Sequence, residues 1–277
     1  MKNFDLHCHS TVSDGLLSPA AVVQRAAANG VDVLALTDHD EIGGLEAAAA
    51  AAAETGIRLI SGVEISIEWQ GTPIHVVGLG FDTKSAAIAD GLAGIRSGRT
   101  ERARRMAADL DRVGIFGTFE GARRHAGNPT LISRSHFARY MVEQGVCPAM
   151  HKVFESYLVP GKPGYVDHRW VSLEDAVAWI TDAGGIAVVA HPARYRISLP
   201  LLRHFLAAFR DCGGRAIEVG SGSHTPEQVE QLARLAREFG FLASCGSDFH
   251  GPDESHVDLG GLAPLPAGLD PVWSALG

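Results

Sequence analysis

Histidine and carboxylate side chains recur at the ends of short apolar segments in this chain. Asp5-Leu6-His7-Cys8-His9-Ser10 comes first, Thr37-Asp38-His39-Asp40 follows the next apolar run, and Gly246-Ser247-Asp248-Phe249-His250 lies near the carboxyl end. Imidazole suits zinc, manganese or iron, whereas carboxylates suit harder divalent ions. The mixed set predicts a cluster of divalent metal ions rather than a single catalytic dyad, and it does not name the metal.

The segments between these motifs predict a regular alternation of strands and helices. We expect strands at residues 3–6, 31–36, 58–67, 73–80, 186–190, 216–219 and 241–245, and helices at 19–29, 46–54, 173–183, 199–211 and 226–239. This alternation indicates a largely parallel sheet, closed as a barrel or doubly wound. The link at Gln70-Gly71 is too short for a helical crossover, so residues 73–80 are expected to run antiparallel to 58–67.

The strand pattern lapses between about residues 100 and 164, where helical patterns take over at 101–112, 135–144 and 148–158. We therefore expect a helical insertion at 100–164 between two barrel segments, residues 1–99 and 165–277. Residues 96–139 hold ten arginines against four acidic residues, a charge of +6, while the remainder of the chain carries −14. Most of these arginines are expected on a solvated helix face; the alternative is an anion-attracting wall facing the metal site.

Composition and cysteine spacing narrow the class of protein. With 46% hydrophobic and 20% charged residues, the chain has enough apolar side chains for a globular core. The four cysteines form no CxxC pair, which argues against a zinc knuckle or a disulfide framework. The sequence shows no signal-peptide pattern and no apolar run of membrane-spanning length, so we expect a cytoplasmic protein without a membrane partner. A net charge of −8 argues against a general nucleic-acid coat protein.

The candidate ligands fall where a (β/α) barrel places its active site, at the carboxyl ends of strands. The residues at or near strand ends are His7, His9, His39, Glu64, His191, Asp248 and His250. His75 comes early in its strand, but the expected reversal would bring it beside Glu64. One isolated histidine on an apolar strand is usually a packed core residue, whereas a whole series at strand ends is better explained by metal binding.

The ordered motifs resemble those of a known family. Asp5-Leu6-His7-Cys8-His9-Ser10, Thr37-Asp38-His39-Asp40, Gly62-Val63-Glu64, His75, Ala190-His191-Pro192 and Ser247-Asp248-Phe249-His250 are similar to the successive signatures of the polymerase and histidinol phosphatase (PHP) family of metal-dependent phosphoesterases. The resemblance covers nearly the whole barrel. It implies an α/β fold, a distorted seven-stranded (β/α) PHP barrel with a small helical insertion domain, and a trinuclear metal centre.

The resemblance also implies how the ligands divide among three ions. His7, His9, Glu64 and Asp248 would hold the first ion, Glu64, His75 and His191 the second, and Asp14, His39 and His250 the third. Glu64 would then bridge two ions. Asp14 stands where other members use histidine; this harder ligand favours manganese, iron or magnesium. Manganese is our first choice, with iron, zinc and magnesium as alternatives.

The insertion resembles a narrower branch, the nucleoside 3′,5′-bisphosphate phosphatases and related 5′-to-3′ exoribonucleases. The similar stretches are Ile132-Ser133-Arg134-Ser135-His136-Phe137-Ala138-Arg139, Pro160-Gly161-Lys162-Pro163-Gly164-Tyr165-Val166 and His191-Pro192-Ala193-Arg194-Tyr195. Arginine binds phosphate through a planar fork and lysine through a point charge. The candidate substrate-binding residues are Arg134, Lys162, Arg194, Ser135 and His224, and His136 could either bind substrate or pack the helix.

The resulting hypothesis is hydrolysis of a phosphate monoester of a nucleoside 3′,5′-bisphosphate, such as adenosine 3′,5′-bisphosphate to AMP and phosphate. A hydroxide bridging the metals would attack phosphorus, and His9, Glu64 and Asp248 would be essential. The alternatives are a 5′-to-3′ exoribonuclease acting on short 5′-phosphorylated RNA and a histidinol-phosphate phosphatase. An amide-bond hydrolase and a non-catalytic metal-binding module fit the complete ligand set less well. The expected partner is a nucleotide, or short RNA, with no obligate protein partner.

Overall fold

Seven strands follow one another in chain order around a nearly closed barrel in the computed structural model, which describes residues 2–168, 170–195 and 197–276. The strands are β1 (Phe4–Asp5), β2 (Val33–Leu36), β3 (Arg58–Trp69), β4 (Thr72–Leu79), β5 (Ile186–Val189), β6 (Ala216–Ser221) and β7 (Leu242–Gly246). The first and last strands meet, because Leu6 N donates to Cys245 O at 2.9 Å and Cys8 bridges Phe249 in parallel. The predicted barrel fold is confirmed.

One strand runs against all the others. β3 and β4 pair antiparallel, β4 and β5 also pair antiparallel, and the remaining neighbours are parallel. The reversal lies at Gln70 and Gly71, which have φ angles of 48° and 74°. Two successive positive φ angles are typical of the tight turn that matches strand twist in a two-residue hairpin. The register sets His75 opposite Ser66, two residues beyond Glu64, as the sequence predicts.

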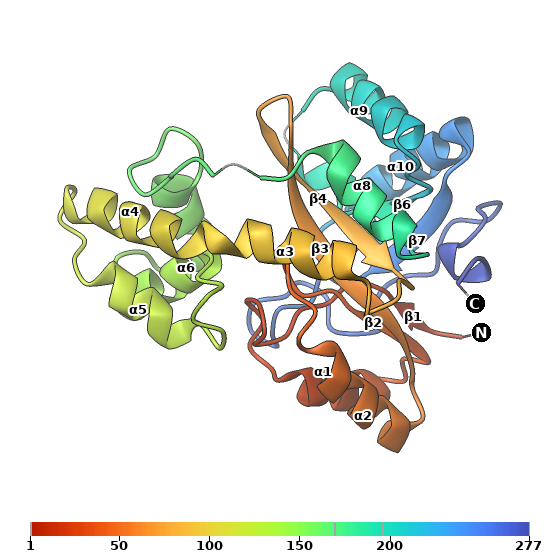
Figure 1. Cartoon of the computed structure of the whole chain (residues 1–277), viewed down its shortest axis with the longest axis horizontal. Helices are drawn as coiled ribbons and strands as arrows, with labels where there is room; N and C mark the ends of the chain where they lie inside the picture. Colours follow the sequence, from red (N-terminus) through yellow and green to blue (C-terminus); the bar gives the residue numbers. More distant parts are fainter. Residues whose placement is uncertain (1, 169, 196, 277) are drawn as a thin grey trace.

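Helices cover the barrel on two sides (Figure 1). α1 (Pro19–Ala28) and α2 (Leu45–Thr55) lie on one side, and α8 (Leu173–Asp182), α9 (Leu199–Asp211) and α10 (Pro226–Phe239) lie on the other. The short 3-10 turns η2 (Pro192–Arg194) and η3 (Val272–Ser274) complete this part of the chain. Capping fixes where α1 begins, because Ser18 Oγ accepts a hydrogen bond from Ala21 N at 3.3 Å and Pro19 occupies the first turn. Over the residues described, no helix is long and apolar enough to cross a membrane.

The insertion extends from the barrel at the end opposite the two termini (Figure 1). α3 (Ala86–Ser97) lies along the barrel and is followed directly by α4 (Arg99–Asp111), then by α5 (Thr118–His125), α6 (Arg134–Glu143), α7 (Met150–Val153) and the π-helical turn η1 (Phe154–Leu158). α3 and α5 have no counterpart among the helices expected from the sequence. The insertion has its own buried cluster around Met106, Leu110 and Phe137, separate from the clusters of the barrel. The chain boundaries 1–99, 100–164 and 165–277 remain a prediction.

Candidate metal centre

The nine predicted ligands lie together at one end of the barrel. Their ligand atoms form four overlapping groups, each with all its atoms within 4.8 Å of one another: His9, Asp14, His39 and His250; His7, His191 and Asp248; His7, His9 and Glu64; and His39, Glu64 and His75. The grouping overlaps the expected sets without reproducing them: His9 joins Asp14, His39 and His250, His39 lies with Glu64 and His75, and His191 groups with His7 and Asp248. The fold therefore brings the nine ligands, which range from His7 to His250 along the chain, to one site. Their division among three ions remains a prediction.

Glu64 lies at the middle of the cluster and is wholly buried. Its Oε1 lies 2.8 Å from His75 Nδ1 and 2.9 Å from His191 Nε2. Its Oε2 lies 2.9 Å from His39 Nδ1 and 3.4 Å from the Nε2 atoms of His7 and His9. Each oxygen thus faces a different set of imidazoles, which is the arrangement that a bridging carboxylate needs.

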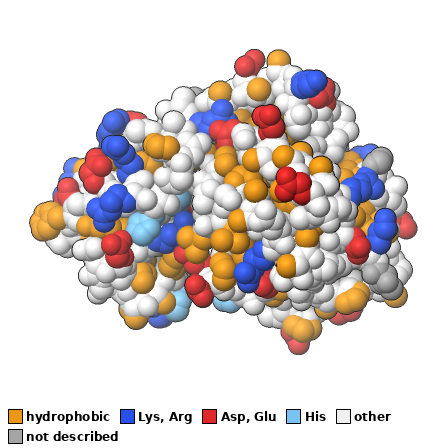
Figure 2. Space-filling model, turned by 90° about the horizontal axis from the view of Figure 1, so that it is seen from below, with side chains coloured by type: hydrophobic (Ala, Val, Ile, Leu, Met, Phe, Trp, Pro, Cys, Tyr) orange, Lys and Arg blue, Asp and Glu red, His pale blue; other side chains and the backbone are white. Residues whose placement is uncertain are grey.

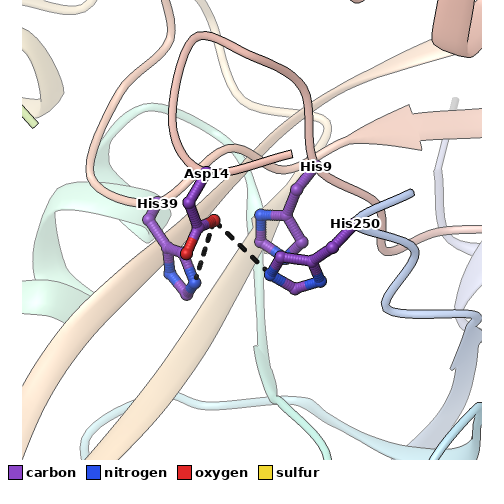
Figure 3. Close-up of side chains that lie close together, drawn as sticks. All are labelled: His9, Asp14, His39 and His250. Atoms are coloured by element: carbon purple, nitrogen blue, oxygen red, sulfur yellow. Dashed lines mark ion pairs between the residues drawn. The ribbon is translucent and has the colours of Figure 1, made fainter. Parts of the chain in front are cut away.

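Asp14 is the centre of a second group (Figure 3). Its Oδ1 lies 3.4 Å from His250 Nε2 and 3.8 Å from His39 Nε2, and the His9 ring stacks against His250 at 4.2 Å between centroids. His250 Nδ1 lies 2.9 Å from the backbone oxygen of Asp248, an acceptor only, so this nitrogen carries the proton. In the neutral ring, the lone pair of His250 Nε2 would then point toward Asp14, as in a metal ligand.

The donor set fits divalent ions better than it fits a network of hydrogen bonds. His7 Nε2 lies 3.1 Å from His9 Nε2, 3.4 Å from Glu64 Oε2 and 3.6 Å from Asp248 Oδ1. Within the part of the chain that the structure describes, the buried atoms Asp14 Oδ1 and Glu64 Oε2 accept no hydrogen bond. Buried lone pairs that converge without a donor are costly unless a cation lies between them.

The protonation states of Glu64, His9 and His191 suit cation binding, whereas His7, His39 and His250 must each give up a proton to a bound cation. Despite burial, neighbouring carboxylates raise the pKa of His7 and His250, and that of His39 to about 9. Burial would raise the pKa of Glu64, but His39, His75 and His7 outweigh it, so that pKa lies well below its usual value. Burial and the neighbouring His250 and His39 lower the pKa of His9 to about 3, and burial with Arg194 lowers that of His191 to about 4. Near neutral pH, Glu64 is therefore ionised and these two imidazoles are neutral, which are the forms that bind metal.

Two aspartates that the sequence analysis did not assign hold the ligand loops in place. Asp38 accepts hydrogen bonds from Ser10 N at 2.7 Å and from Ser13 Oγ at 2.6 Å, which fixes the loop that carries Asp14. Asp40 accepts from Ser66 N at 2.7 Å and pairs with an arginine of α4. The sequence carried a signal for this role: on an extended segment, successive side chains point to opposite sides, so Asp38 and Asp40 point away from the side of His39.

The backbone is strained at the same place. Among the described residues other than glycine, positive φ angles occur at Asp40 (50°), Gln70 (48°), His191 (27°) and Asp248 (56°). His191 and Asp248 are predicted ligands, and Asp40 follows a third. Such conformations cost on the order of 1–3 kcal/mol each and are typical of functional sites.

A pocket opens beside the cluster, between barrel and insertion, and arginines form much of its wall. Arg99, Arg102, Arg134 and Arg194 line it together with Ser133, Ser135, Phe154, Trp170 and seven of the predicted metal ligands. Arg99 pairs with Asp40 and Arg194 with Asp248. Arg102 donates to Val166 O at 2.9 Å and Arg134 to Leu158 O at 3.4 Å, and within the described chain neither has a carboxylate ion pair. The charges of these two arginines are therefore only partly offset, by the more distant carboxylates of Asp167 near Arg102 and Asp14 near Arg134.

The electrostatics of these arginines indicate an anion site. Burial, with the neighbouring Arg134 and Arg99, lowers the pKa of Arg102 to about 9. Burial and nearby arginines also lower the pKa of Arg134, although Tyr165 opposes this. A bound anion would relieve the mutual repulsion of these cations.

Not every arginine of the insertion faces the pocket. Arg104, Arg112, Arg123 and Arg124 are more than half exposed, and basic and acidic side chains are interspersed over the insertion in Figure 2. Arg99 and Arg102 share the face of α4 that also buries Ala103 and Met106. Arg99, Arg102, Ala103 and Met106 recur every three or four residues, as on one helix face. This spacing could have distinguished, from the sequence, the arginines that face the protein from those that face solvent.

The other predicted substrate residues divide between the pocket and its surroundings. Ser135 and Arg194 line the pocket. Lys162 is exposed and His224 bonds to Val219 O at 3.1 Å; neither lines the pocket. His136 is wholly buried, and its Nδ1 accepts from Ser133 N at 3.0 Å in a capping box that begins α6.

Comparison with known proteins gives one family and several close relatives. The family model of the PHP domain matches residues 5–115. A 3′,5′-nucleoside bisphosphate phosphatase of Chromobacterium violaceum is 51% identical over 100% of this chain and 97% of its own length. A 5′-3′ exoribonuclease of Haemophilus influenzae is 42% identical over 98% of both chains.

Two solved structures share the whole fold. A Chromobacterium violaceum protein described as an amidohydrolase, solved with bound sulfate and without metal, superimposes with a TM-score of 0.97 at 51% identity, covering 99% of this chain and 95% of the other. A Bifidobacterium adolescentis protein described as a metal-dependent phosphoesterase gives a TM-score of 0.82 at 27% identity, covering 99% and 94%. The similarity therefore includes the insertion as well as the barrel.

Proposed function

Because this chain belongs to the PHP family of metal-dependent phosphoesterases, we propose that it hydrolyses the 3′-phosphate monoester of a nucleoside 3′,5′-bisphosphate. The relative from Chromobacterium violaceum is named a 3′,5′-nucleoside bisphosphate phosphatase, and the match covers 97% of its length. For adenosine 3′,5′-bisphosphate the products would be AMP and inorganic phosphate.

The observation that carries this proposal is the pair of arginines next to the ligand cluster that, among the described residues, form no ion pair with a carboxylate. A substrate with two phosphates needs two anion sites one nucleoside apart, and the pocket offers the cluster as one site and Arg102 with Arg134 as the other. Guanidinium groups in a partly buried site bind phosphate strongly through charge-assisted hydrogen bonds. The ammonium end of histidinol phosphate would be repelled by the same arginines.

The chain's residues prepare the site in three ways. The carboxylates and neutral imidazoles around Glu64 and Asp14 would hold divalent ions. Bound ions supply Lewis-acid stabilisation of the phosphoryl oxygens and lower the pKa of water to near neutrality. Arg194, at the pocket wall beside Asp248, lies where it can contact the same phosphoryl group. Water adds its oxygen to phosphorus, the bond from phosphorus to the ribose oxygen breaks, and that oxygen takes up a proton.

We further propose that three ions bind and that manganese is the native metal. The overlapping groups in the cluster support more than one ion. Asp14 adds a third carboxylate to those of Glu64 and Asp248, and carboxylates favour manganese, iron or magnesium over softer ions. Anomalous scattering at metal absorption edges from crystals grown with a metal mixture would test both the identity and the number.

A second candidate is cleavage of short 5′-phosphorylated RNA, the activity named for the Haemophilus influenzae relative. An open groove continues from the pocket and shares Ser135, Phe154, Arg194, Asp248 and His250 with it. The 5′-terminal nucleotide would occupy the pocket and the next nucleotide this groove. Asp253 is exposed in the groove and would repel a longer phosphodiester strand, whereas Glu143 and Glu254, which also line it, pair with His125 and Arg139.

One experiment separates the two candidates. The manganese-loaded protein is assayed with adenosine 3′,5′-bisphosphate and with a 5′-phosphorylated tetraribonucleotide over a range of salt concentrations. We expect a higher kcat/KM for the bisphosphate than for the tetraribonucleotide. The kcat/KM for the bisphosphate should fall only weakly with salt, because its two phosphates are the only groups whose binding salt would screen. A tetranucleotide that is cleaved faster, with a steep loss of rate in salt, would instead assign strand binding.

A further inference from the structure

β6 supplies none of the nine predicted ligands, yet it carries a wholly buried carboxylate. Glu218 lies between the apolar residues Ile217 and Val219, and its side chain is shielded from solvent. A buried carboxylate needs strong partners, because an isolated buried charge is costly. Each of the two oxygens of Glu218 has such a partner in the metal cluster.

The first partner is the ring of His7. Its Nδ1 lies 2.6 Å from Glu218 Oε1, so the proton on Nδ1 is donated to the carboxylate. Nε2 of the same ring faces Glu64 Oε2 at 3.4 Å and Asp248 Oδ1 at 3.6 Å. A proton fixed on Nδ1 leaves the lone pair of Nε2 directed at the cluster, which is the tautomer that a metal ligand requires.

The second partner is the backbone of another ligand. His191 N donates to Glu218 Oε2 at 2.6 Å, at the residue whose φ angle is 27°. Glu218 therefore orients the ring of His7, which follows β1, and holds the strained turn at His191, which follows β5. By contrast, His9 Nδ1 and His191 Nδ1 are buried and have no hydrogen-bond partner in the part of the chain described.

We infer that Glu218 is a positioning residue of the metal centre, which fixes the tautomer of His7 and the backbone of His191 while binding neither metal nor substrate. The inference rests on the proposed metal-dependent function. Outer carboxylates of this kind typically contribute about 10- to 100-fold to metal affinity. A merely structural carboxylate would stabilise the fold and leave the metal affinity of the folded protein unchanged.

The isosteric variant Glu218→Gln tests the inference, because glutamine has one acceptor oxygen where two donors must be met. If its oxygen accepts from His191 N, its amide donates to His7 Nδ1, and the proton of His7 moves to Nε2 and blocks the lone pair. If its oxygen faces His7 instead, the amide opposes His191 N and the strained turn is released. Both arrangements disturb one ligand.

The measurement is calorimetric titration of the metal-free protein with Mn²⁺, with bound metal counted by elemental analysis. We expect about 10- to 100-fold weaker binding of at least one ion to Glu218→Gln, and kcat near that of the wild type once Mn²⁺ saturates. Glu227→Gln, an exposed change on α10, is the matched control and should bind Mn²⁺ as the wild type does.

Circular dichroism of the metal-free proteins separates folding from metal binding. If Glu218→Gln does not fold, Glu218→Asp replaces it: aspartate keeps both acceptors but is shorter by one methylene, so weaker Mn²⁺ binding by a folded protein is again expected. Wild-type Mn²⁺ affinity in the folded variant would overturn the inference and leave the proposed function intact. A wild-type protein that binds no Mn²⁺ would overturn the proposed function itself.

Discussion

Removing the Arg134 side chain should lower kcat/KM strongly only when the substrate carries a second phosphate. Arg134 lines the pocket, and within the described chain its hydrogen bond is a long contact of 3.4 Å to Leu158 O. Truncation to alanine therefore leaves no buried carboxylate without a partner, so the fold should be kept. The variant Arg134→Ala thus isolates the interaction with the substrate.

The expected loss follows from the kind of bond removed. A hydrogen bond to a charged group contributes about 1.5–3 kcal/mol, which corresponds to roughly 10- to 150-fold in kcat/KM. That loss should occur with adenosine 3′,5′-bisphosphate. With adenosine 3′-monophosphate, which lacks the second phosphate, the loss should stay below about threefold.

The assay is release of inorganic phosphate from both substrates by wild type and variant, combined as a double-mutant cycle. Arg104→Ala, which removes an arginine that is 61% exposed, serves as the control and should leave both rates unchanged. Equal losses of Arg134→Ala with the two substrates would refute the assignment of Arg134 to the second phosphate.

Three further changes test other parts of the site. Glu64→Gln removes the charge that faces five imidazoles and should lower kcat more than about 100-fold at saturating Mn²⁺; a variant that binds Mn²⁺ fully yet keeps near-wild-type turnover would contradict the role of Glu64. Arg139→Met removes two hydrogen bonds to Glu254, at 2.7 and 2.6 Å, and one to Asp14 O. We therefore expect weaker Mn²⁺ binding, measured by titration, and a higher KM, measured by kinetics. Unchanged values would show that this link between α6 and the barrel is dispensable. Gly246→Ala would set a Cβ 2.2 Å from His7 Cβ and should lower the free energy of unfolding by at least about 1–3 kcal/mol. Its control Gly94→Ala, in open space on α3, should raise that free energy by about 0.5–1 kcal/mol. Denaturant unfolding measures both, and equal stabilities of the two variants would contradict the packing argument.

The ligand cluster was predictable from the sequence because strand ends of a barrel meet at one edge. His7 and Asp248 follow β1 and β7, and Glu64 lies within β3 beside its bridge to His39, so the topology brings these distant parts of the chain together. His75 needed one additional inference, the reversal at Gln70-Gly71, which the hairpin confirms.

The surroundings of the cluster were harder to predict, since they depend on contacts between elements. Glu218 appears in the sequence as one charged residue in an apolar strand, and only the fold brings it against His7. The arginine-rich segment shows an excess of positive charge, but which arginines turn inward depends on the packing of α4 and α6 against the barrel. Helix α5 was missed because its eight residues include Gly121 and few apolar side chains.

The most direct test of the proposed function is the reaction itself. Purified protein loaded with Mn²⁺ is incubated with adenosine 3′,5′-bisphosphate, and the products are separated by chromatography before and after chelation of the metal. The proposed function predicts AMP and one equivalent of inorganic phosphate, with the activity lost on chelation and restored by Mn²⁺. No release of phosphate by the metal-loaded protein, or release that chelation leaves unchanged, would contradict it.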